Sequence, residues 1–387
     1  MYITSVSVEN YRAISKRTIS FTDSSGMPRP VSVIVGPNGC GKTSILFGIM
    51  QALRGVMGYR TTDVPEPTRD DIRLPASTQT GWTDKPPEST VEVELQFSDE
   101  EQKIIPEVMK RLHKAPPPDL PDGRIVVQWK YPPGFDSDGV KREWWCGSVS
   151  PHLDNVRFWL MAKAWAIGAG RELGLDLVAK VGGLEFFPQD RNLLLRVVGG
   201  DDWEESGTGW DESSSGQDEE QPDEVPSHRG RHDRPVSDIL ESLAEYAAKR
   251  GNTLPDEWNR EKRIQEIFDR VCSPKKYLGI KYREGIPYPV LEDGSHIYPL
   301  GNAASGEQVI LEYITRLIYR GQIMRSVILI DEPEIHLHPK WIRQLYLALP
   351  HIGHQNQFIL TTHSDELRRR ASADNAIIEL GSLGVEE

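Results

Sequence analysis

A glycine-rich loop lies between a predicted strand and a predicted helix, and this order constrains the fold more than any other feature of the chain. Residues 31–35 are an apolar run typical of a strand, and residues 43–53 carry apolar side chains at helical spacing. The loop between them, residues 36–43, reads GPNGCGKT and fits the pattern G-x-x-x-x-G-K-[ST]. Its glycines allow backbone N–H groups to point at phosphates, and the helix start adds positive potential. The sequence therefore predicts an α/β fold with a phosphate-binding loop.

The side chains of this loop have distinct predicted roles. Lys42 should reach the β- and γ-phosphates of a nucleotide, and Thr43 should place its hydroxyl on Mg²⁺. Cys40 is predicted to be a small filler whose thiol, if exposed, would make the protein sensitive to alkylation. A glycine-rich turn that binds nothing is the alternative, and the flanking strand and helix argue against it. The predicted nucleotide-binding residues are Asn38, Gly39, Cys40, Gly41, Lys42, Thr43 and Ser44.

Two adjacent carboxylates end a second apolar run, residues 327–330. No polar residue interrupts this run, which indicates a strand buried on both faces of a parallel sheet. Such strands present their chemistry at their carboxyl ends, so Asp331 is predicted to hold the hydration shell of Mg²⁺ and Glu332 to polarise an attacking water. A third run, residues 358–360, ends shortly before His363, which is predicted to hydrogen-bond the γ-phosphate and sense its loss. Taken alone, the acids could be solvated and the histidine structural.

A short polar segment precedes a strongly amphipathic predicted helix. Residues 304–308 read ASGEQ, and apolar side chains then recur at helical spacing from residue 309 onward. Ser305 and the free N–H groups of the helix start would form a second anion-binding surface. The alternative is that Ser305 only caps the helix.

The charge of the chain is concentrated in one segment. The formal net charge is −13, and residues 199–224 hold eleven Asp or Glu and no Lys or Arg, which leaves about −2 for the remainder. Residues 199–235 are also rich in Ser, Gly and Pro, so we expect a disordered acidic insertion. The basic runs 16–17, 275–276 and 368–370 could meet phosphates or be solvated surface.

Composition and apolar patterning predict a cytoplasmic protein. The sequence has 38% hydrophobic residues, enough for a substantial core, but no apolar stretch long enough to span a bilayer and no signal peptide. Its three cysteines are widely separated and form neither a disulfide framework nor a zinc pattern. We therefore expect no membrane association and a reducing compartment.

Together, and in this order, the motifs resemble those of ATP-binding-cassette ATPases. Residues 36–43 correspond to Walker A, residues 305–308 to the signature motif, residues 330–333 to Walker B, and His363 to the switch histidine. The chain is most similar to the branch that contains the SMC and RecF proteins and the overcoming-lysogenisation-defect (OLD) ATPases. The segments that match this branch are residues 8–14, a predicted hairpin at 291–294, residues 334–339 and Trp341.

This resemblance implies a fold and a chemistry. The expected fold is an α/β P-loop ATPase head, a mixed, mainly parallel central sheet with flanking helices, joined to a helical lobe. ATP and Mg²⁺ are the implied cofactors, and Lys42, Glu332 and His363 the implied catalytic residues. The metal would be held by Thr43, Asp331 and Gln189, the last matching the glutamine that ends a strand in this family.

The resemblance also implies a composite site. ATP would be sandwiched in a homodimer or a higher homo-oligomer, so that hydrolysis requires a second subunit. Arg12 is expected near the base or the α-phosphate, with a surface arginine as the alternative. His336 and His338 are expected to pack and orient the dimer interface, with a metal site as the alternative. The residues implied to act in trans are Ser305, Gly306, Glu307 and Gln308.

The motifs predict how the chain is divided. Residues 1–98 and 325–387 are expected to form the two halves of ATPase lobe I. Residues 236–324 are expected to form a helical lobe II that carries the signature motif. A helical and β insert, residues 99–198, and the acidic linker, residues 199–235, lie between them.

Departures from the family narrow the expected function. Glu307 replaces the second glycine of the transporter signature, which argues against a membrane transporter. The segment between the motifs is too short for the coiled coil of an SMC protein, and too little chain follows His363 for the TOPRIM nuclease domain of OLD proteins. We therefore expect an ATPase subunit that gates a separate effector, such as a nuclease or toxin in prokaryotic antiviral defence. The alternatives are a DNA-repair or maintenance clamp that binds DNA through residues 368–370, and a scaffold that binds ATP and barely hydrolyses it.

Overall fold

The structure is a computed structural model. It describes residues 1–57, 88–117, 119–131, 146–147, 159–160, 181, 183–187, 236–250, 259–284, 286–321, 326–335, 337–353 and 355–381. Gln189, His336 and the acidic segment 199–235 lie outside the described residues.

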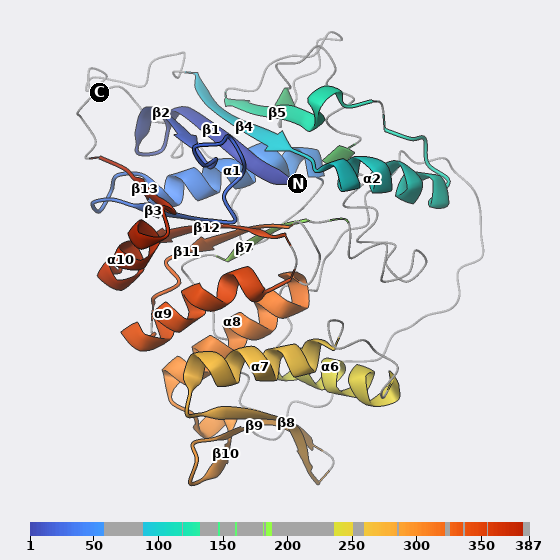
Figure 1. Ribbon diagram of the computed structural model, residues 1–387, viewed down its shortest axis with the longest axis vertical. Helices are drawn as coiled ribbons and strands as arrows, with labels where there is room; N and C mark the ends of the chain where they lie inside the picture. The colour runs from blue at the N-terminus through green and yellow to red at the C-terminus, as the bar shows by residue number, and fades with distance from the viewer. Residues whose placement is uncertain are drawn as a thin grey trace.

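A five-stranded parallel sheet forms the middle layer of the molecule (Figure 1). Its order is β13-β3-β12-β11-β7, and all four pairings are parallel. The strands therefore come from both ends of the chain and from its centre. Their bounds are β3 (Val31–Val35), β7 (Leu184–Phe187), β11 (Val327–Asp331), β12 (Gln357–Thr362) and β13 (Ile377–Glu379).

Both faces of this sheet are covered, which explains the uninterrupted apolar runs. Successive side chains of a strand point to opposite faces. In β11, Leu329 belongs to the core on one face, whereas Ile328 and Ile330 belong to the core on the other. In β12, Ile359 and Leu360 are divided in the same way. The prediction of strands buried on both faces is confirmed.

A second, antiparallel sheet lies above the first, in the order β2-β1-β4-β5-β6 (Figure 1). Its β4 strand alternates buried and half-buried residues, as the strict alternation of the sequence predicts. Helix α1 (Lys42–Met57) contacts strands of both sheets. The strand bounds are β1 (Tyr2–Tyr11), β2 (Ile14–Ser20), β4 (Ser89–Gln96), β5 (Arg124–Tyr131) and β6 (Cys146–Gly147).

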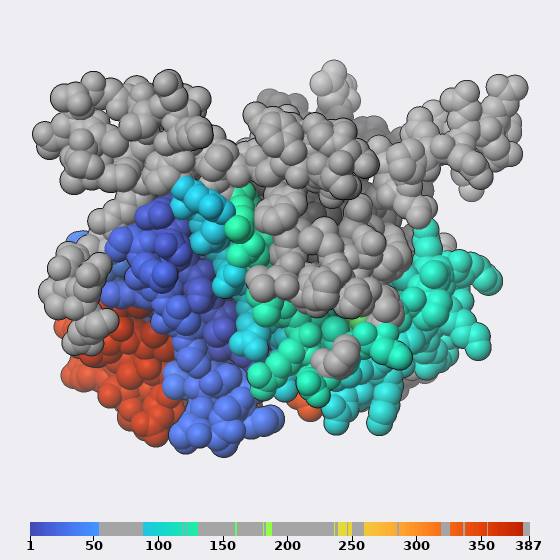
Figure 2. Space-filling view, turned by 90° about the horizontal axis from the view of Figure 1, so that it is seen from above, coloured from blue at the N-terminus to red at the C-terminus, as the bar shows by residue number. Residues whose placement is uncertain are grey.

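The α/β class is confirmed, and the structure shows how parallel and antiparallel strands are combined. One mixed, mainly parallel sheet was expected from the sequence. The described strands of this region form two sheets instead, one parallel and one antiparallel. Helix α1 packs between the two sheets and buries Ile45, Leu46 and Ile49. Strand β4 pairs with β5, so the sheet continues across the boundary predicted at residue 98. Seen from above in Figure 2, C-terminal residues lie beside N-terminal ones, as the pairing of β13 with β3 requires.

Helices cover the other face of the parallel sheet and lead to a small three-stranded sheet. Helices α8 and α9 lie below the parallel sheet, and α6, α7 and the sheet β10-β9-β8 lie beyond them (Figure 1). The hairpin predicted near residue 293 is the β9–β10 turn, in which Asp293 accepts the N–H groups of Ser295 and His296. The bounds are α6 (Val236–Arg250), α7 (Arg260–Cys272), β8 (Lys276–Arg283), β9 (Ile286–Glu292), β10 (Ile297–Pro299), α8 (Ser305–Gly321) and α9 (Pro339–Ala348).

Two helices lie near the edges of the sheets. Helix α2 (Asp99–Arg111) begins with the predicted capping box, in which Ser98 and Glu101 each accept the other's backbone N–H. Helix α10 (Asp365–Ala373) follows β12 and begins at the carboxyl edge of the parallel sheet. Short 3₁₀ turns occupy Pro121–Gly123, Leu300–Asn302 and Leu349–His351.

Candidate functional site

The glycine-rich loop joins β3 to α1, as predicted, and its backbone depends on glycine. Gly39 and Gly41 have φ values of +76° and +94°. A Cβ on Gly41 would lie 2.6 Å from the Ile14 Cγ1 atom, whereas one on Gly39 would meet nothing within 4 Å. The turn between β1 and β2 therefore supports the loop at Gly41. Cys40 is buried, which fits its predicted role as a filler.

Lys42 is buried at the point where the loop passes into α1. Its Nζ atom donates hydrogen bonds to the carbonyl oxygens of Gly36 and Pro37, at 3.0 and 3.1 Å. The side chain is held among neutral acceptors, and a phosphate oxygen would provide a charged and therefore stronger one. The ammonium group is thus available for the predicted contact with phosphates.

Asp331 connects the loop with the second motif. Its Oδ1 atom accepts hydrogen bonds from the Thr43 hydroxyl, at 3.1 Å, and from the Thr361 hydroxyl. Only 1% of Asp331 is exposed. The fold thus brings together two predicted Mg²⁺ ligands that are 288 positions apart in the chain.

The donor set at this point suits Mg²⁺. The cation prefers oxygen ligands and is usually held by one or two carboxylates together with phosphate and water oxygens. Thr43 and Asp331 offer a hydroxyl and a carboxylate. No group of three or more His, Cys, Asp or Glu side chains that could hold a metal occurs among the described residues. The hydroxyl and the carboxylate fit a cation that a nucleotide also helps to bind. Gln189, the third predicted ligand, lies outside the described residues.

Glu332 is positioned beside Asp331 by an unusual backbone conformation. Its φ value is +46°, which non-glycine residues rarely adopt. Its N–H group donates to the carbonyl and hydroxyl oxygens of Thr361, both at 3.2 Å, and these bonds hold the conformation. Burial raises the pKa of the Glu332 carboxyl group, nearby His363 lowers this pKa, and Asp331 raises it further.

His363 lies within reach of Glu332. The His363 Nε2 atom is 3.4 Å from the Glu332 Oε1 atom, and the imidazole is 37% exposed. The two residues follow the ends of neighbouring parallel strands, in which Asp331 pairs with Thr361. The predicted grouping of Lys42, Thr43, Asp331, Glu332 and His363 at one edge of the sheet therefore agrees with the geometry.

Arg12 lies in the turn between β1 and β2. Its guanidinium group lies 4.2 Å from the centroid of the Phe47 ring on α1 and 5.8 Å from that of Tyr11. The same turn supports the phosphate-binding loop through Ile14. Arg12 is partly exposed and close to the loop, and its contact with a nucleotide stays a prediction.

The helix that carries the signature motif begins at residue 305, inside the polar segment that was expected to precede it, and Ser305 does not cap it. The carbonyl of Ala304 accepts the Gln308 N–H at 3.2 Å, so Ala304 is the N-cap and Ser305 is the first helical residue. Ser305 is exposed and Gly306 is half-buried. This leaves the start of the helix accessible.

The side chains of Glu307 and Gln308 are bound within their own chain, so their predicted role in trans does not hold for these side chains. Glu307 is 1% exposed and contacts the Lys275 ammonium group. It also accepts hydrogen bonds from the Tyr298 hydroxyl at 3.1 Å and from the Ala304 N–H at 3.3 Å. Gln308 Nε2 donates to two carbonyls of residues 300 and 303, both at 3.1 Å. Only Ser305 and Gly306 remain as candidates for a second subunit.

Two residues of the site were not predicted, Thr361 and Glu334. Thr361 accepts from Glu332 and donates to Asp331, and Glu334 accepts three hydrogen bonds from residues 362–364. Glu334 lies inside the segment 334–339 that matched the family branch, and Thr361 directly follows the apolar run 358–360. Their roles depend on the register of β11 against β12, which a single sequence does not specify.

The arginines proposed for DNA binding already have acidic partners. Arg368 pairs with Glu379 at 2.8 Å, and Arg369 pairs with Glu366 at 3.1 Å. Arg370 pairs with Asp374 at 3.3 Å. The run is therefore largely neutralised on this surface.

His338 has a structural role. Its Nδ1 atom accepts the Lys340 N–H at 3.2 Å, so the imidazole caps α9. This bond occupies one of the two ring nitrogens through which a histidine can bind a metal. The predicted metal alternative therefore finds no support at His338, and His336 lies outside the described residues.

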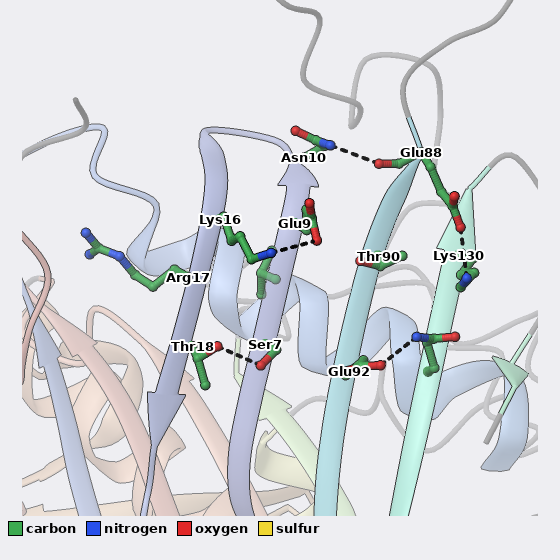
Figure 3. A pocket seen from close by; sticks show the side chains of 12 residues that line it. Ser7, Glu9, Asn10, Lys16, Arg17, Thr18, Glu88, Thr90, Glu92 and Lys130 are labelled. Carbon is green, nitrogen blue, oxygen red and sulfur yellow. Dashed lines mark hydrogen bonds and ion pairs between the residues drawn. The ribbon is translucent and has the colours of Figure 1, made fainter. Parts of the chain in front are cut away.

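A hollow of about 500 Å³ lies on the outer face of the antiparallel sheet, away from α1 (Figure 3). Four of its charged groups form two ion pairs. Lys16 lies 3.6 Å from Glu9, Lys130 lies 2.9 Å from Glu88, and a glutamine of β5 donates to a glutamate of β4 at 2.6 Å. The groups at the phosphate-binding loop are not part of its lining.

Comparison with known proteins finds AAA-type ATPase domains in this chain. Residues 1–113 match the family described as "AAA ATPase domain", and residues 200–369 match the family described as "AAA domain, putative AbiEii toxin, Type IV TA system". A solved structure, "Crystal structure of the SmcHead bound to the C-winged helix domain of ScpA", is similar over 98% of this chain and 94% of that chain. Its TM-score is 0.53 and its sequence identity 14%, so the likeness concerns the fold alone.

Two curated proteins are related in sequence over shorter stretches. "Retron Vc95 probable ATPase" of Vibrio cholerae serotype O1 biovar El Tor is 26% identical over 141 residues, and "Septu protein PtuA" of Bacillus thuringiensis is 41% identical over 66 residues. The matches cover 33% and 17% of this chain, and they span only 27% and 16% of the two relatives.

The two AAA-type family models match separate parts of the chain, and both agree with a P-loop ATPase of the AAA class. Together with the SMC-head-like fold, these matches support the OLD/SMC-like AAA ATPase branch that the motifs predicted. Among the described helices, none combines the length and the apolar character needed to cross a bilayer.

Proposed function

We propose that this protein hydrolyses ATP with Mg²⁺ as a dimer that closes on the nucleotide and thereby gates a separate effector. The observation that carries the proposal is the junction at Asp331, where the Thr43 hydroxyl, the Asp331 carboxylate and the Thr361 hydroxyl meet beside Glu332. This arrangement offers a metal site and a carboxylate base next to a phosphate-binding loop.

Each residue has a role that follows from its position. Bound Mg²⁺ would neutralise charge that develops on the phosphates. The loop N–H groups and Lys42 would bind the phosphates, while Thr43 and Asp331 would orient the cation. Glu332, whose pKa is raised by burial, would accept a proton from the attacking water. The His363 imidazole, beside Glu332, would bind a γ-phosphate oxygen.

The accessibility of the signature segment supports a second subunit. Ser305 is exposed at the first turn of a 17-residue helix, where free N–H groups and the helix dipole attract anions. Glu307 is fixed inside its own chain and keeps this helix start in place. Ser305 and Gly306 of one subunit would therefore complete the site of the other.

The proposal of a separate effector is based on sequence similarity to the two curated proteins. The retron ATPase and the Septu protein are related over parts of their length to this chain, which agrees with the expectation of a prokaryotic antiviral role. The effector would be a nuclease or toxin carried by another polypeptide. The arginine run, residues 368–370, does not support the alternative function of a DNA-binding clamp, because each of these arginines has a carboxylate partner.

Complementation between two inactive variants tests the composite site. Lys42→Ala should lose nucleotide binding, whereas Ser305→Arg should bind ATP normally and lose turnover. Mixed together, they should regain part of the turnover, because a heterodimer has one intact Lys42 opposite one intact Ser305. Phosphate release measures the rates, and sedimentation with and without ATP measures dimerisation.

Three outcomes would contradict the proposal. The enzyme assignment is wrong if wild-type protein and Glu332→Gln turn over ATP equally slowly while both bind it. The trans role is wrong if the mixture stays inactive although both variants fold and associate. The gating role gives way to the clamp if ATP induces salt-sensitive DNA binding by the purified protein and no other polypeptide co-purifies with it from native cells.

A further inference from the structure

The turn after the two carboxylates is tied to the segment that carries His363. Glu334 lies in this turn, two residues beyond Glu332, and its Oε1 atom accepts three hydrogen bonds. The donors are the Thr362 hydroxyl at 2.8 Å, the His363 N–H at 2.6 Å and the Ser364 N–H at 3.1 Å. One carboxylate oxygen thus collects donors from three consecutive residues.

Only one of the two carboxylate oxygens of Glu334 accepts hydrogen bonds from the described residues. The Oε2 atom of Glu334 is shielded from solvent and accepts no hydrogen bond from the described part of the chain. The carboxylate is therefore oriented by residues 362–364 through its other oxygen. Hydrogen bonds from N–H groups to a carboxylate are stronger than bonds between neutral groups, so the backbone of these three residues is fixed firmly.

Backbone hydrogen bonds stabilise the turn that follows Glu332. The Ile335 N–H donates to the Glu332 carbonyl at 3.3 Å, and the Leu337 N–H donates to the Glu334 carbonyl at 2.9 Å. On the other side of the tie, His363 Nε2 lies 3.4 Å from Glu332 Oε1. The backbone position of His363 limits where its imidazole can lie, so the bonds from residues 362–364 to Glu334 affect the distance between His363 and Glu332.

We propose that Glu334 is a positioning residue that fixes the switch segment, residues 362–364, to the turn following Glu332 and thereby keeps His363 beside the catalytic carboxylate. The assignment rests on the proposed function for its effect on turnover. The hydrogen bonds of the Glu334 side chain among the described residues go to residues 362–364, so we expect its substitution to affect turnover more than ATP binding.

Substitution of the acceptor tests the role. Glu334→Ala should lower kcat by about 10- to 100-fold, as expected for the loss of two or three hydrogen bonds to a charged group, and leave the KM for ATP within about twofold. It should also speed amide hydrogen exchange of residues 362–364. Glu334→Gln keeps an acceptor oxygen of the same reach and should restore both quantities to within about threefold of wild type.

Two further variants serve as a control and as an independent test of the hydrogen bonds to Glu334. Glu366→Ala removes a nearby carboxylate that pairs with Arg369 and should leave kcat and the exchange rate unchanged. Thr362→Val removes one of the three donors and should give an intermediate effect. Unchanged exchange and kcat in Thr362→Val would overturn the proposal even where Glu334→Ala does not fold.

The failure of this inference differs from the failure of the proposed function. If Glu334→Ala folds and matches wild type, or if Glu334→Gln behaves like Glu334→Ala, the positioning role is wrong although the protein is an ATPase. If wild type binds ATP without any turnover, the proposed function is wrong. The hydrogen exchange of residues 362–364 then decides the structural role of Glu334 by itself.

Discussion

The two halves of the predicted composite site differ in how complete they are within one chain. At the phosphate-binding edge, Thr43, Asp331, Thr361, Glu332 and His363 already contact one another, although they come from opposite ends of the sequence. At the signature segment the polar side chains turn inward, and only the first turn of α8 is left accessible. The proposed nucleotide-binding half is thus assembled within one chain, whereas the signature helix starts at the exposed Ser305.

This difference has a structural cause. The phosphate-binding edge collects the carboxyl ends of parallel strands, where side chains converge. The signature helix begins after a 3₁₀ turn at the border of the three-stranded sheet, and its first residues pack against that sheet through Glu307. Substitutions in the two halves should therefore separate nucleotide binding from turnover.

The largest expected effect is on nucleotide affinity. Lys42→Ala removes the buried ammonium group that is proposed to bind the phosphates, and it should weaken ATP binding by about 10- to 100-fold or more, the loss of one or two charged hydrogen bonds. Ser305→Arg should leave the affinity within about twofold. Fluorescence titration with a labelled ATP analogue compares the two variants. Equal losses of ATP affinity would show that the phosphate-binding edge and the signature segment do not differ in their effect on nucleotide binding.

The next effect concerns the stability of the signature half. Glu307→Ala leaves Lys275 and Tyr298 without their buried acceptor and should lower the free energy of unfolding by about 2 to 4 kcal/mol. Urea denaturation measures the change. Glu266→Ala is the control, because this carboxylate forms an exposed ion pair on α7 and should cost less than about 1 kcal/mol. Similar losses in both variants would show that Glu307 is not a special anchor.

A matched pair of glycine substitutions tests how the antiparallel sheet supports the loop. Gly41→Ala forces a Cβ to within 2.6 Å of Ile14 and adds backbone strain at φ +94°, so it should cost about 2 to 3 kcal/mol. Gly39→Ala has similar strain at φ +76° without a clash and should cost about 1 kcal/mol. Thermal unfolding of the two proteins gives the difference. Equal losses of unfolding free energy in the two variants would mean that the Ile14 side chain moves aside without destabilising the loop.

The smallest effect is expected at the basic run. Arg369→Gln breaks an exposed pair with Glu366 and should change the free energy of unfolding by less than about 0.5 kcal/mol. It should also leave ATP turnover unchanged. A clear loss of ATP-dependent DNA binding in a gel-shift assay would instead favour the clamp and make this surface a third functional region.

The motifs predicted much of the site because they carry local chemistry. The loop at residues 36–43, the carboxylates at the end of β11 and the histidine after β12 each lie where a buried strand passes into a loop or turn, and apolar runs in the sequence mark such junctions. The roles of Glu307 and Thr361 were missed for one reason. Both depend on which strand or turn lies opposite, and the sequence of a segment does not specify its neighbour in the fold.

The amino-acid sequence by itself determined the class of the protein, because the loop GPNGCGKT and the run ending on Asp331-Glu332 require a buried strand followed by a loop or turn with fixed chemistry. Only the tertiary structure decided that Glu307 faces its own chain, that Ser305 stays accessible, and that Glu334 holds the segment of His363. These facts depend on long-range register and packing, since contacts between distant segments arise when α1 and the two sheets pack into one core.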